Sequence, residues 1–103
     1  MRVTIDAAEL PPDSSKQVVV GGVKVALVRI GDDVYAIGDT CTHAEVSLSE
    51  GEIDADECTI ECWKHGSQFS LTTGEPLSLP ATRPVAVHAA GLDGDSIWVE
   101  VRD

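Results

Sequence analysis

Apolar and polar residues alternate along most of this chain, with the two-residue period of strands that bury one face. No stretch has a convincing helical period of useful length. The pattern predicts short strands at residues 3–5, 17–20, 23–30, 34–37, 58–61, 68–71, 85–88 and 96–101, with a further strand edge over residues 52–56.

Turn residues separate these strands at the intervals typical of small β-sandwiches and barrels. Gly21-Gly22 is a two-residue hairpin signal. The last hairpin is expected to turn across residues 91–95, and the prolines at positions 76, 80 and 84 mark a segment that cannot be a central strand. The chain is therefore predicted to be all-β, with antiparallel sheets in a small sandwich.

Length and charge limit the possible functions. The chain has 103 residues, which predicts a single domain over residues 1–103. No apolar run approaches the roughly 20 residues of a membrane span, and no secretory signal is recognisable, so no membrane association is expected. The net charge is −11, and ten of the eighteen acidic residues lie between positions 30 and 63, which argues against nucleic-acid binding. This acidic stretch either keeps the protein soluble or forms a docking face for a redox partner.

Two pairs of residues carry the candidate chemistry. Cys41 and His43 form a Cys-x-His pair, and Cys62 and His65 form a Cys-x-x-His pair after eighteen intervening residues. Two thiolates and two imidazoles are the ligands of a [2Fe–2S] centre in which two His replace two Cys on one iron. Structural zinc also takes Cys and His, although it usually does so from Cys-x-x-Cys and His-x(3–5)-His pairs. A Cys–His nucleophile is the third alternative, and it would leave two of the four ligands without a role.

One cysteine and one histidine fall outside these pairs. Cys58 is the third of three cysteines, and an odd count without a second spare thiol indicates a reduced, cytoplasmic setting. It is interpreted as a small buried apolar residue, with a reactive thiol as the alternative. His88 is expected to be a surface or packed strand residue and not a ligand.

The motifs resemble the Rieske family, and most closely the Rieske-type [2Fe–2S] ferredoxins of bacterial aromatic-ring-hydroxylating oxygenase systems. The resemblance covers essentially the whole chain and is carried by residues 41–43 and 62–69, with further matches at 39–40, 74–76 and 79–81. It implies the Rieske fold of three stacked antiparallel sheets, with a cluster-binding subdomain inserted at about residues 39–72. It also implies one [2Fe–2S] cluster per chain, with Cys41 and Cys62 on the inner iron, His43 and His65 on the outer iron, and a segment near Pro80 covering the cluster.

The same resemblance implies a function in electron transfer. The chain would be a ferredoxin and not an enzyme, with no catalytic residues of its own. It would carry single electrons from a flavin-dependent ferredoxin reductase, which uses FAD and NAD(P)H, to a terminal oxygenase. The alternative is the small Rieske subunit of an assimilatory nitrite reductase, a lineage that often lacks some of the ligands. The cluster-loop disulfide of high-potential Rieske proteins is missing, and Phe69 occupies the position of a sulfur-bonding tyrosine, so a low potential, around or below 0 mV, is expected.

Overall fold

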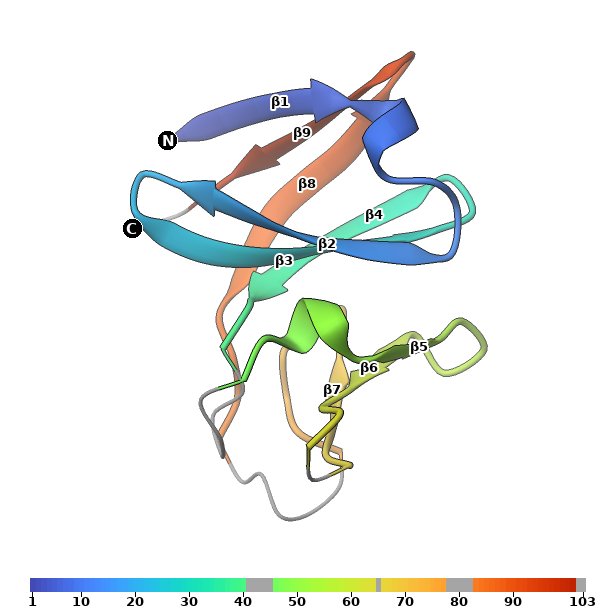
Figure 1. Cartoon of the computed structure of the whole chain (residues 1–103), viewed down its shortest axis with the longest axis vertical. Coiled ribbons are helices and arrows are strands. Elements are labelled where there is room, and N and C mark those ends of the chain that lie inside the picture. Colours follow the sequence, from blue (N-terminus) through green and yellow to red (C-terminus); the bar gives the residue numbers. More distant parts are fainter. Residues whose placement is uncertain (41–45, 65, 78–82, 102–103) are drawn as a thin grey trace.

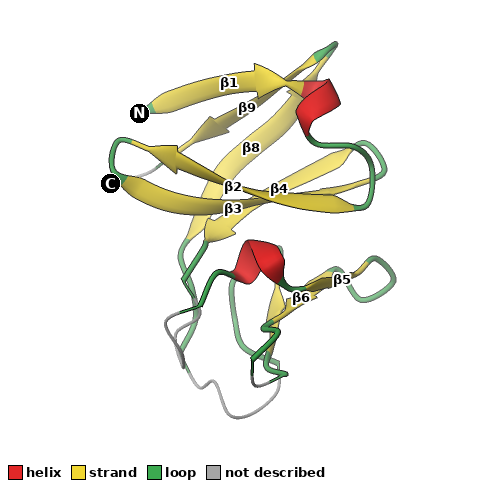
Figure 2. Cartoon of the chain, viewed as in Figure 1, coloured by secondary structure: helices red, strands yellow, loops and turns green. Residues whose placement is uncertain are grey.

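The computed structural model describes residues 1–40, 46–64, 66–77 and 83–101, and within these it is built almost entirely of strands (Figures 1 and 2). The elements are β1 (Arg2–Asp6), η1 (Ala7–Glu9), β2 (Ser14–Val20), β3 (Val23–Ile30), β4 (Asp33–Gly38), η2 (Leu48–Glu50), β5 (Glu52–Asp54), β6 (Thr59–Glu61), β7 (Gln68–Ser70), β8 (Val87–Asp93) and β9 (Ser96–Glu100), where η denotes a 3₁₀ helix. The predicted all-β class is confirmed. No helix in the described part is long and apolar enough to cross a membrane.

Two antiparallel sheets make up the described part of the fold. The larger sheet has six strands in the order β1-β9-β8-β4-β3-β2, and the smaller has three in the order β5-β6-β7. The start of β8 pairs with β4 through Val87 and His88, whereas its later residues 89–93 pair with β9. Two of the three sheets expected from the family resemblance are therefore joined along β8. In Figure 1, β1 and β9 form the upper layer, β2 to β4 the middle layer and β5 to β7 the lower one.

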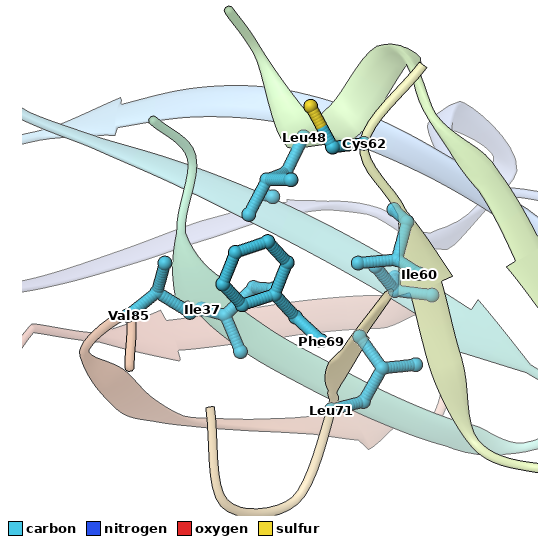
Figure 3. Close-up of a cluster of buried hydrophobic side chains, with 9 residues drawn as sticks. Ile37, Leu48, Ile60, Cys62, Phe69, Leu71 and Val85 are labelled. Atoms are coloured by element: carbon cyan, nitrogen blue, oxygen red, sulfur yellow. The ribbon is translucent and has the colours of Figure 1, made fainter. Parts of the chain in front are cut away.

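The middle layer separates two hydrophobic cores. Successive residues of a strand point to opposite faces, so β3 sends Val25 and Leu27 into one core and Ala26 and Val28 into the other. All four side chains are fully buried, which explains why β3 reads as an apolar run and not as a strict alternation. The core below β3 and β4 faces the smaller sheet (Figure 3), and its buried members are Ala26, Val28, Ile37, Leu48, Ile60, Cys62, Phe69, Leu71 and Val85.

The last hairpin differs from the prediction. Strand β8 continues through Asp93, and the turn is confined to Gly94 and Asp95. Gly91, expected in the turn, lies inside the strand opposite Trp98. A β-carbon at this position would lie 2.8 Å from the Trp98 indole nitrogen, so the glycine serves the close approach of an aromatic ring and not a turn.

The smaller sheet belongs to a long excursion between two neighbouring strands. Strand β4 ends at Gly38, whose amide donates to the carbonyl of Ala86 at 2.8 Å, directly before β8. The chain thus leaves and re-enters the larger sheet at adjacent points. Residues 39–86 include η2, β5 to β7 and both predicted ligand pairs, and η2 and β5 to β7 lie at the lower end of the molecule in Figure 1.

Candidate metal centre

Of the four predicted ligands, only Cys62 lies within the described residues. Cys41, His43 and His65 fall outside them, as does the segment around Pro80. Cys62 follows the last residue of β6 and is fully buried, at the edge of the lower core. Its sulfur points away from the Phe69 ring at the centre of that core (Figure 3). Among the described residues, no three His, Cys, Asp or Glu side chains gather closely enough to hold a metal ion.

The segment that contains Cys41 and His43 is closed at its base. Thr40 and Ser47 form an isolated antiparallel bridge on either side of it. The amide of Leu48 donates to the carbonyl of Asp39 at 2.6 Å. Leu48 itself is fully buried and is the first residue of η2, so the returning end of the segment is anchored in the lower core.

Asp39 is the centre of the hydrogen bonds at this base. The Ser47 hydroxyl contacts both of its carboxylate oxygens, Oδ1 at 2.8 Å and Oδ2 at 2.6 Å. The amide of Ser49 donates to Oδ1 at 3.0 Å, and the side-chain amide of Gln17 donates to Oδ2. Burial would raise the pKa of Asp39, but these hydrogen bonds from Ser47, Gln17 and Ser49 outweigh it and lower the pKa below its usual value.

The segment from Cys62 to Ser67 is closed in the same way. The amide of Cys62 donates to the carbonyl of Ser67 at 2.7 Å, and the amide of Gly66 donates to the carbonyl of Cys62 at 2.8 Å. Gly66 has a φ of 77°, a left-handed conformation that glycine adopts without strain. Strands β6 and β7 extend this hairpin, beginning with the pair Glu61 and Gln68. The backbone of Cys62 is therefore fixed on both sides.

A close backbone contact ties the two segments together. Gly51 follows η2, and a β-carbon placed on it would lie 1.8 Å from the carbonyl oxygen of Glu61, the residue before Cys62. Only a residue without a side chain permits this approach. The chain that returns from the first segment is thus held directly against the strand that delivers Cys62.

These observations fit a metal cluster at this end of the fold. A thiol at a strand end is a suitable thiolate ligand when its backbone is held in place, as that of Cys62 is. The first pair lies on a segment whose two ends are pinned together. The four ligands stay a prediction from the sequence. Sequence reasoning did not predict the hydrogen bonds around Asp39, since Gln17 lies 22 residues before it and no local signal connects them.

The spare cysteine and the spare histidine are both half-buried. Cys58 is half-buried against the lower core, with a φ of 56°, so the prediction of a buried apolar residue is only partly correct. A hydrogen bond with Cys58, together with burial, raises the pKa of Tyr35 to about 12. His88 is a half-buried residue of β8, as expected of a packed strand histidine.

The surface beside Cys62 combines an aromatic ring with acidic groups. Trp63 is 56% exposed. A surface hollow of about 360 Å³ lies between it and three carboxylates, and its lining residues are Glu50, Gly51, Glu52, Glu61, Cys62 and Trp63.

Comparison with known proteins gives consistent matches. Residues 2–89 match the family described as the Rieske [2Fe-2S] domain. Ferredoxin CarAc from Metapseudomonas resinovorans is 40% identical over 94 residues, which cover 90% of this chain and 86% of that protein.

Solved structures extend this similarity to the fold. The ferredoxin of carbazole 1,9a-dioxygenase from Nocardioides aromaticivorans IC177 superposes with a TM-score of 0.90 at 36% identity, covering 96% of this chain and 95% of that one. A chain of the complex of reduced oxygenase and oxidized ferredoxin in carbazole 1,9a-dioxygenase gives a TM-score of 0.84 at 38% identity, covering 95% and 91%. A structure described as a nitrite reductase small subunit shares the fold with a TM-score of 0.84, but at only 21% identity over 98% and 99% of the two chains.

Proposed function

The chain belongs to the Rieske [2Fe–2S] family, and from this premise we propose that it is a ferredoxin that delivers single electrons to a terminal oxygenase. The predicted cofactor, a [2Fe–2S] cluster, is confirmed by the family, and when bound it takes up and releases one electron. The observation that carries the proposal is the similarity to dioxygenase ferredoxins over nearly the full length of both chains. These relatives are electron-transfer components of oxygenase systems, as the sequence predicted.

We propose that Cys41, His43, Cys62 and His65 hold the cluster. The buried thiol of Cys62 and the pinned ends of the segment 41–45 support this assignment. Neutral imidazoles in place of two thiolates remove negative charge from the centre, which raises its potential above that of an all-cysteine cluster. The cluster-binding subdomain of the single domain would then comprise about residues 39–72.

The partners follow from the relatives. The carbazole system provides a solved complex between its ferredoxin and its oxygenase, so a terminal oxygenase is the partner with the most direct support. The electron donor would be a flavin-containing ferredoxin reductase that uses NAD(P)H, and the setting would be the cytoplasm. Trp63, half-exposed directly after Cys62, is suited to contact such a partner close to the cluster.

The nitrite reductase alternative is a distant one. The shared fold at 21% identity does not extend to function, and the ferredoxins are nearly twice as similar in sequence. This chain also retains all four ligand positions.

A single-turnover experiment tests the proposal. The purified protein is reduced with NADH and a ferredoxin reductase, and then mixed anaerobically with the oxidised terminal oxygenase of the carbazole system. We expect the visible absorption of the ferredoxin to bleach in the first step and to return in the second. A protein that accepts no electron from any reductase, or keeps its electron when mixed with oxygenases, would contradict the proposal. Its cluster-free form is the matched control.

A further inference from the structure

Asp39 is the single acidic side chain that is buried among the described residues, at 2% exposure. It lies two positions before Cys41, at the point where the chain leaves β4 for the first ligand segment. A buried ionised carboxylate is unfavourable unless it is fully hydrogen-bonded, so its position requires an explanation.

The hydrogen-bond donors around Asp39 favour the ionised form of its carboxyl group. Both oxygens accept from the Ser47 hydroxyl, Oδ1 also accepts from the Ser49 amide, and Oδ2 also accepts from Gln17. These partners are neutral. The ion pairs within the described residues are Lys16 with Glu9 and Arg29 with Asp32, and neither involves Asp39. Dipoles stabilise the charge but do not cancel it.

The same hydrogen bonds join the two ends of the first ligand segment. Asp39 lies on its outgoing side, whereas Ser47 and Ser49 lie on its returning side. Gln17 adds a third attachment from β2 of the larger sheet. Without the carboxylate, the Ser47 hydroxyl would lose its contacts to both oxygens, and the Thr40–Ser47 bridge would remain as the closure.

We propose that Asp39 is a positioning residue that joins the residues on either side of the first ligand segment, and that its fixed negative charge lowers the reduction potential of the cluster. The inference rests on the proposed function. The added electron and the carboxylate repel each other, so reduction is disfavoured. Exposed acids exert less of this effect because solvent and salt screen them.

The charge is tested by redox titration of the loaded protein with two variants. Asp39→Asn removes the charge but keeps the shape, and the amide of Gln17 can turn to match it. Gln17→Lys keeps Asp39 and places an ammonium beside Oδ2, at a strand position exposed to solvent. We expect both midpoints to rise. For Asp39→Asn the rise corresponds to about a tenfold change in the equilibrium constant for reduction, which is about 59 mV for one electron. For Gln17→Lys the rise is smaller, because solvent screens a charge at this exposed position. Glu50→Gln neutralises an acidic residue that is exposed to solvent, and it should shift the midpoint far less.

The closure is tested by Ser47→Ala, which removes the hydroxyl that bridges both carboxylate oxygens but leaves the charge. We expect iron release to an added chelator to accelerate severalfold, with little change in midpoint. Ser14→Ala removes a surface hydroxyl bonded to Pro11 and is the matched control.

The outcomes separate this inference from the proposed function. Iron-loaded Asp39→Asn and Gln17→Lys with unchanged midpoints would overturn the role of the charge. Unaltered iron release from Ser47→Ala would overturn the closure. A folded Asp39→Asn variant that retains no cluster would support the positioning role of Asp39. The midpoint of Gln17→Lys would then show whether charge at this place affects the potential. A wild-type protein without iron and sulfide would refute the proposed function itself.

Discussion

Substitution of Gly51 by alanine tests the contact that ties the two ligand segments together. The new β-carbon would lie 1.8 Å from the Glu61 carbonyl oxygen and 2.9 Å from its carbonyl carbon. Because both are backbone atoms, β5 and β6 must move apart by about 1.5 Å to reach ordinary contact, and the Glu52–Glu61 pair is lost. Forced overpacking costs about 1–3 kcal/mol and each lost backbone hydrogen bond about 1 kcal/mol, so we expect a destabilisation of about 3 kcal/mol.

A destabilisation of this size is readily measured by thermal unfolding. At about 4–8 °C per kcal/mol for a domain near 100 residues, the melting temperature should fall by about 12–24 °C. Gly22→Ala is the matched control, because nothing lies within 4 Å of its added β-carbon and the remaining cost is that of a φ of 83°. That strain amounts to about 1–2 kcal/mol. The reasoning is refuted if Gly51→Ala melts within a few degrees of the wild type, or no lower than the control at the same scan rate.

Two further predictions concern Tyr35 and the surface beside the cluster. Cys58→Ala should bring the pKa of Tyr35 from about 12 back toward 10.0, which an absorbance titration reports directly because the chain has one tyrosine. The raised pKa of Tyr35 adds stability that is complete below pH 10 and is lost as the pH rises toward 12. The Cys58→Ala variant should therefore lose less stability than the wild type between pH 10 and pH 12. Equal losses in the two proteins would argue against the hydrogen bond. Trp63→Ala should slow electron transfer to the oxygenase while leaving the absorption spectrum unchanged, because the ring is half-exposed beside Cys62. An unaltered rate would show that the ring makes no contact with the partner.

The fold was largely predictable because strand periodicity is a local property. The strands at 23–30 and 34–37 were found nearly to the residue, since their turns carry the glycine and aspartate that tight hairpins need. The last hairpin was misplaced because Gly91 looks like a turn residue, and only the packing of Trp98 against it shows otherwise. The 3₁₀ helices, each of three residues, are too short to show a period.

The family could be predicted from the sequence, but the contacts around the candidate site could not. Cys and His at fixed short spacings are a local signature, and that signature identified the family. The Asp39 hydrogen bonds, the Gly51–Glu61 contact and the pairing of Tyr35 with Cys58 join residues that are 8 to 23 positions apart. Such contacts depend on how the layers stack, and no local sequence pattern predicts this stacking.

The central claim is that two histidines and two cysteines hold one [2Fe–2S] cluster. The most direct measurement is electron–nuclear double resonance on the reduced protein, grown with ¹⁵N-labelled histidine and assayed for iron and sulfide. The account predicts two irons and two sulfides per chain, with two strongly coupled histidine nitrogens that persist in His88→Gln and fall to one in His65→Cys. A protein with zinc in place of iron, or a reduced centre without any histidine coupling, would contradict it.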